Sequence, residues 1–138
     1  MSLYRIFDIA ANNMSAQTLR LNTTTSNISN ANSVSSSVEK TYRARHPVFS
    51  ALVNDFSDAS SGVGVKVDGI VESATPLRSE YRPDHPKANQ EGYIFFPNVN
   101  LVEEMANMIS ASRSYRTNVE VVNTSKQMLM RTLALGDA

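Results

Sequence analysis

The chain has 138 residues, with 13 basic and 13 acidic side chains, so its formal net charge is zero. A neutral chain has no general electrostatic attraction to nucleic acid, and we expect no nucleic-acid partner. The absence of cysteine excludes a disulfide framework, a thiol nucleophile and a thiolate metal site.

Proline and glycine divide the chain into three parts. All five prolines and four of the five glycines lie between positions 47 and 97, and the fifth glycine is Gly136. Because these residues interrupt helices, the flanking stretches are expected to be unbroken arms. The pattern predicts an α+β fold with an N-terminal helical arm (1–38), a small antiparallel β central domain (39–97) and a C-terminal helical arm (98–138) that pairs with the first.

The first arm carries apolar residues at alternating steps of four and three. Leu3, Phe7, Met14 and Leu21 follow this repeat, which places them in one stripe along a helix with the period of a coiled coil. Between positions 22 and 37, however, 13 of 16 residues are Asn, Ser or Thr, which are mediocre helix formers. This segment is therefore either a polar loop or a helix that forms only when partner helices surround it.

The second arm shows the same repeat from Leu101 to Leu133. Asn98 or Asn100 is suited to cap its first turn, and Gly136 is suited to end it. Helices of roughly 45–50 Å are too long for a compact domain of this mass, so we expect the two arms to pair as a coiled-coil-like hairpin.

The centre of the chain carries the strand signals. Val63, Val65 and Val67 alternate with polar or glycine positions, and Tyr93–Phe96 is a short apolar run. Residues 58–62 and 84–86 have the composition of turns. We expect a few short antiparallel strands in this region.

No group of residues predicts catalysis or metal binding. His46 and His85 each precede a proline and have no companion at ligand spacing, whereas a metal site needs three or four converging ligands. Arg113 and Arg116 flank Tyr115, but on a neutral chain this is more typical of a solvated or inter-subunit helix face. We expect no enzyme activity, no catalytic residue and no cofactor.

The sequence also lacks membrane and secretion signals. No stretch approaches the ~18 consecutive apolar residues of a membrane span, so we expect a protein that is not membrane-spanning. The first residues lack the basic and apolar regions of a cleavable signal peptide.

Motifs in both arms resemble those of the bacterial flagellar rod and hook proteins, the axial proteins of the flagellum. In the first arm the resemblance rests on Met14-Ser15-Ala16-Gln17 and on Ser26-Asn27-Ile28-Ser29-Asn30-Ala31-Asn32-Ser33, which are typical of the whole family. In the second arm, Ser110-Ala111-Ser112-Arg113-Ser114-Tyr115 and the short length of the chain are similar to a proximal rod protein.

The resemblance implies a structural subunit of the flagellar basal body that lies in the periplasmic rod. Such proteins leave the cell through the flagellar type III export apparatus, without a cleavable signal peptide. Their terminal helices assemble with other copies and with other flagellar rod proteins into a helical tube that transmits motor torque.

The stripes and the shared motif together predict an assembly interface on the two arms. Its residues are Leu3, Phe7, Met14, Leu21, Asn27, Ile28, Asn30, Ala31, Leu101, Met105, Met108, Arg113, Tyr115, Val119, Val122, Leu129 and Leu133. Two other interpretations remain open from the sequence. One is another short rod protein or an adaptor at the base of the rod. The other is a secreted helical-hairpin module that binds a partner helix in its groove.

Overall fold

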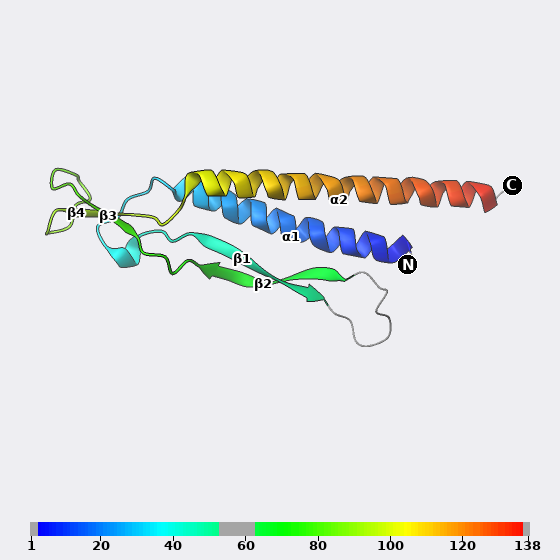
Figure 1. Ribbon diagram of the computed structural model, residues 1–138, viewed down its shortest axis with the longest axis horizontal. Coiled ribbons are helices and arrows are strands. Elements are labelled where there is room, and N and C mark those ends of the chain that lie inside the picture. Colours follow the sequence, from blue (N-terminus) through cyan, green and yellow to red (C-terminus); the bar gives the residue numbers. More distant parts are fainter. Residues whose placement is uncertain (1–2, 53–62, 137–138) are drawn as a thin grey trace.

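The computed structural model describes residues 3–52 and 63–136. Its two long helices are α1 (Leu3–Asn30) and α2 (Leu101–Gly136). They lie side by side and run in opposite directions, and the C-terminal end of α2 extends past the start of α1 (Figure 1). The predicted α+β fold with paired terminal helices is confirmed, whereas the turn expected at 58–62 lies outside the described residues.

The polar end of α1 is helical, and threonine hydroxyls along α1 bond to the backbone of their own helix. The hydroxyls of Thr18, Thr23 and Thr25 each donate to the carbonyl four residues earlier, at 2.9, 2.8 and 2.8 Å. Such bonds satisfy the hydroxyl without a partner outside the helix. The helix ends at Asn30, and a non-helical connection leads to a short 3₁₀ turn at Val38–Lys40. Residues 22–30 are therefore helical and residues 31–37 are not, while the dependence of that helix on partner helices stays a prediction.

The first strand pair forms a long ribbon beside α1. Strands β1 (Arg45–Leu52) and β2 (Gly64–Glu72) are antiparallel, with a register shift between Val48 and Phe49. Figure 1 shows the ribbon on the side of α1 that faces away from α2, so α1 is the middle layer of the molecule. Because a two-stranded ribbon is marginal alone, its order depends on what it packs against.

A second, smaller hairpin lies at the end of the molecule where α2 begins (Figure 1). It consists of β3 (Arg78–Tyr81) and β4 (Tyr93–Phe96), which are also antiparallel. The connection that follows α1 joins it, since the backbone of Ser35 exchanges two hydrogen bonds with that of Phe95, at 3.0 and 2.9 Å. Gly92 has φ +82°, and a Cβ there would lie 2.8 Å from the Tyr81 ring, so only glycine fits without strain.

The interior holds small and polar side chains more than large apolar ones. Four alanines are buried in the described part of the chain, and Ile94 is the one large apolar side chain that is fully buried there. The buried polar residues are Thr23, Thr24, Asn27, Thr41, Glu104 and Ser125. Small residues let helices approach closely but bury little apolar area, so a single subunit has a weak core.

Candidate assembly interface

The face of α2 that meets α1 is made of small and polar residues. Glu104, Ala111 and Ser125 are its buried positions, and the Ala111 side chain is 0% exposed. These residues are spaced by multiples of seven, as in a coiled coil, but they are not the apolar positions that define the predicted stripe. Two side-chain hydrogen bonds cross to α1: Asn13 donates to Asn118 over 3.4 Å, and Arg20 donates to Asn107 over 3.0 Å.

The predicted interface residues of α2 lie largely around the edges of this contact. One group is half-buried, namely Met108, Val119, Val122 and Leu129. A second group is exposed, namely Leu101, Met105, Arg113, Tyr115 and Leu133. Pairing within the subunit therefore leaves much of the apolar stripe open to neighbouring molecules.

The predicted interface residues of α1 are more deeply placed, because α1 lies between α2 and the ribbon. Asn27 is buried, and the half-buried set is Phe7, Met14, Leu21, Ile28, Asn30 and Ala31. The side chain of Leu3 lies outside the described part of the structure. The helix thus uses most of its circumference within the subunit.

Asn27 joins α1 to the start of β1. Its amide nitrogen donates to the carbonyl of Arg45 over 2.8 Å, and its amide oxygen accepts from the Arg45 N–H over 2.9 Å. The same oxygen accepts the Tyr42 hydroxyl over 2.8 Å. The Asn27 side chain is 0% exposed, and a buried amide with three bonds fixes its partners strongly.

Asn98, in the connection before α2, binds the backbone of Ala44, the residue before Arg45. Its amide oxygen accepts the N–H of Ala44 over 2.8 Å, and its nitrogen donates to the carbonyls of Ser73 and Thr75 over 3.3 and 2.8 Å. We call Asn27 and Asn98 the amide clamp. It binds successive backbone N–H groups at the base of the ribbon.

Exposed apolar side chains gather at both ends of α2. Near its start they form the outer stripe, which consists of Leu101, Val102, Met105 and Ile109. At its end they form the overhang, residues 128–136, which lies at the part of α2 that extends past α1 (Figure 1). There Met128, Met130, Leu133 and Leu135 are 59–81% exposed. These positions point in several directions around the helix, and a helix that is apolar all round is normally surrounded by other protein.

The ribbon exposes apolar side chains as well. They are Val48, Phe49, Leu52, Val63, Ile70 and Val71. The ion pair between Arg45 and Glu72, at 3.1 Å, and the pair between Lys66 and Asp68, at 3.6 Å, are both solvent-exposed. Exposed pairs stabilise little, so neither ion pair holds the ribbon in place.

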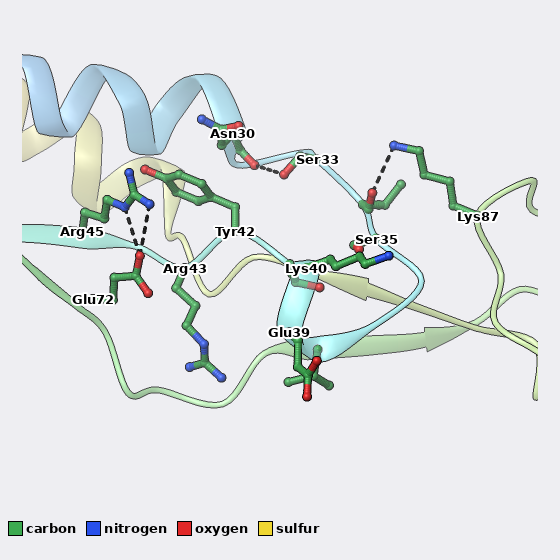
Figure 2. A pocket seen from close by; sticks show the side chains of 13 residues that line it. Asn30, Ser33, Ser35, Glu39, Lys40, Tyr42, Arg43, Arg45, Glu72 and Lys87 are labelled. Carbon is green, nitrogen blue, oxygen red and sulfur yellow. Dashed lines mark hydrogen bonds and ion pairs between the residues drawn. The ribbon is translucent and has the colours of Figure 1, made fainter.

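A groove of about 790 Å³ lies between the end of α1 and the base of the ribbon. Figure 2 shows that its charged side chains largely engage the protein itself: Arg45 turns to Glu72, and Lys87 donates to the carbonyl of Val34 over 3.2 Å. Arg43 donates to the carbonyl of Ser73 over 3.2 Å. The groove is therefore part of the joint between helix and ribbon.

Residues 3–52 and 63–136 contain neither a cluster of metal ligands nor a membrane-spanning helix. There, no three His, Asp or Glu side chains gather where they could hold a metal ion. Neither described helix has an apolar run long enough to cross a membrane.

Curated proteins similar to this chain match it from end to end. The flagellar basal-body rod protein FlgC of Escherichia coli O6:H1 is 48% identical over 136 residues, covering 99% of each chain. FlgC of Salmonella typhimurium is 45% identical with the same coverage, and FlgC of Borreliella burgdorferi is 36% identical over 98% of each chain. The chain belongs to the FlgC family of flagellar basal-body rod proteins.

A family model agrees with this membership. Residues 90–135 match the family described as the C-terminal region of the flagellar basal body rod FlgEFG proteins. That segment includes β4 and nearly all of α2. The FlgC relatives are named as rod components, which confirms the expectations of a structural protein and of no enzyme activity.

Two interface features of this FlgC-family chain were not predicted from its sequence. Asn98 and Asn100 were both suited to cap α2, and Asn100 has that role, since its side chain accepts the N–H groups of Val102 and Glu103 at 3.2 and 3.5 Å; the bonds of Asn98 to Ala44, Ser73 and Thr75 were not predicted. The contact of Tyr42 with Asn27 was not predicted either, and its hydroxyl donates the third hydrogen bond of that side chain. A tyrosine close to a buried asparagine leaves no signal in a single sequence.

Proposed function

We propose that the chain is a self-assembling subunit of the flagellar rod, and that α1 and α2 make the contacts between subunits. The main support for the proposal is that large apolar side chains are common on the surface and rare in the interior. Twenty large apolar or aromatic side chains in the described part of the chain are exposed, whereas Ile94 alone among large apolar residues is fully buried. A monomer with so much exposed apolar area and so little core is suited to burying that area against other subunits.

The positions of the exposed patches support an assembly that propagates. The outer stripe and the overhang are two different surfaces, at opposite ends of one helix. A contact between unlike surfaces is heterologous, and repetition of it builds a ring or a helical filament. At roughly 25 cal/mol per Å², a few hundred Å² of apolar area buried at each contact would contribute several kcal/mol.

The proposed tube would transmit motor torque through its rigidity. Each subunit supplies a pair of helices of about 42 and 54 Å at 1.5 Å per residue. The two helices are joined by hydrogen bonds as well as by packing. Many such pairs held by neighbours would resist twisting, because close-packed side chains have low compressibility.

The same proposal includes the partners and the location inferred from the resemblance. Other copies of the chain, other rod proteins and the flagellar type III export apparatus are the proposed partners, and nucleic acid is not among them. The proposed location is the periplasmic part of the basal-body rod, reached without a cleavable signal peptide. The weak subunit core supports export of an unfolded chain that gains order on assembly.

Amide exchange tests whether assembly supplies the order of the helices. In a dilute purified monomer we expect rapid exchange over residues 1–35 and 100–138. In isolated basal bodies we expect the same amides to exchange at least a hundredfold more slowly, because neighbouring subunits bury both helices. Slow exchange over both segments in the dilute monomer would refute assembly-dependent folding.

A further inference from the structure

The two asparagines of the amide clamp form hydrogen bonds with the backbone at the start of β1 from opposite sides. Successive N–H groups in an extended strand point in opposite directions. Asn98 accepts the N–H of Ala44 over 2.8 Å, and Asn27 accepts the next one, from Arg45, over 2.9 Å. One asparagine belongs to the last turn of α1, and the other lies three residues before α2. The base of the ribbon is thus held by both terminal segments at once.

Each asparagine makes three hydrogen bonds through its side-chain amide. Asn27 makes three hydrogen bonds inside the protein, and its side chain is buried. Asn98 also ties down the carbonyls of Ser73 and Thr75, just after β2 ends. If α1 unwinds at its end, Asn27 loses the position from which it reaches Arg45.

The contacts of the ribbon with the rest of the protein run through α1. The ribbon packs along α1 and lies away from α2 (Figure 1). Its two exposed ion pairs and its mostly exposed side chains give it little independent stability. Its order therefore depends on the helix and on the clamp.

We propose that the amide clamp is a folding latch, which makes the order of the ribbon conditional on the pairing of α1 with α2. This rests on the proposed function, in which both helices become ordered only during assembly. The ribbon then packs on α1 when the two helices pair. A subunit therefore has an ordered ribbon on its surface only after its helices are ordered. Before that, the ribbon is a detached, fluctuating hairpin.

The latch can be tested in the full chain without any assembly. Because the sequence has no cysteine, an Asn13→Cys/Asn118→Cys pair supplies one engineered disulfide between helices whose side chains meet at these positions. Oxidation locks the helices together, and reduction releases them. Amide exchange of residues 43–52 and 64–74 reports on the ribbon, while residues 5–20 report on α1.

We expect oxidation to slow exchange in the ribbon at least tenfold. In the oxidised chain, Asn27→Ala should remove most of that protection while residues 5–20 remain protected. Asn22→Ala is the matched control, since Asn22 is exposed on the same helix, and it should leave the protection unchanged. Tyr42→Phe removes one bond to Asn27 and keeps the ring, so a smaller loss is expected from it.

Three results would overturn the latch. The first is a ribbon that is as protected from exchange in the reduced chain as in the oxidised one. The second is full protection of the ribbon in the oxidised Asn27→Ala and Tyr42→Phe chains. The third is a loss of protection in Asn22→Ala as large as that in Asn27→Ala. A different result would contradict the proposed function. Ordered helices in the reduced monomer would contradict assembly-dependent folding, and the comparison of the oxidised variants would still test the latch.

Discussion

Replacing Ala111 with leucine is expected to prevent rod assembly. The Ala111 side chain is 0% exposed and lies where α2 contacts α1. Three additional carbon atoms there must push the helices apart, and overpacking of this kind costs about 1–3 kcal/mol. A subunit with so small a core cannot absorb that cost. The measurement is the number of rods in basal bodies isolated from cells that carry only the variant chain.

Ala111→Ser provides the matched control for size. Serine is close to alanine in volume, and its hydroxyl can bond to the carbonyl four residues earlier in the helix, as several threonines of α1 do. Cells with this variant should build rods in normal number. Normal rods from Ala111→Leu would show that close contact of α1 and α2 is not required.

Placing charge on the overhang is expected to abolish assembly without removing contacts inside the subunit. Met130 and Leu133 are about 60% exposed in the subunit, at 61% and 59%, so Met130→Asp/Leu133→Asp disturbs few contacts within it. If neighbours bury both positions, each loses about 1.5–3 kcal/mol of apolar burial, and each new carboxylate adds a desolvation penalty. Sedimentation of purified assemblies, together with rod counts in cells, measures the loss.

Thr124→Asp is the control for the overhang, because it adds a carboxylate at an exposed polar position of α2 before the overhang begins. We expect it to weaken assembly far less than the double variant does. Equal losses from the two variants would assign the effect to added charge in general. Unchanged assembly of the double variant would contradict burial of the overhang by neighbours.

The elements of the fold were largely predictable, because they depend on local signals. The absence of proline and glycine outside the centre marked both helices, and the alternation at Val63–Val67 marked β2. The end of α1 was harder to predict, since Asn, Ser and Thr favour loops and caps as readily as helix. The burial of Thr23 and Asn27 against the rest of the protein favours helix at that end.

The orientation of the helices could not be predicted, because the apolar stripe and the contact between helices are offset. The stripe of α2 has the same period as the buried positions and runs beside them, so it is exposed at Leu101, half-buried at Leu129 and exposed again at Leu133. The true contact is centred on Ala111, whose small side chain carries no strong pattern signal. The face of α2 that contacts α1 could therefore not be predicted, because its residues are small and polar.

The role of Asn27 depended on geometry that no local pattern contains. The sequence placed it in a shared motif and in the predicted interface. The structure adds that its amide bonds to the backbone of Arg45, 18 residues later in the chain. Asn98 acts on the neighbouring residue from still further away, and only the folded chain brings the two amides together.

Electron cryomicroscopy of isolated basal bodies, at a resolution that shows side chains, tests most directly whether the terminal helices make the contacts between subunits. The expected result is that α1 and α2 of this chain contact the helices of neighbouring rod subunits, and that Val102, Met130 and Leu133 become buried there. A rod in which these side chains remain exposed to solvent, with subunits joined only through their strand regions, would contradict it.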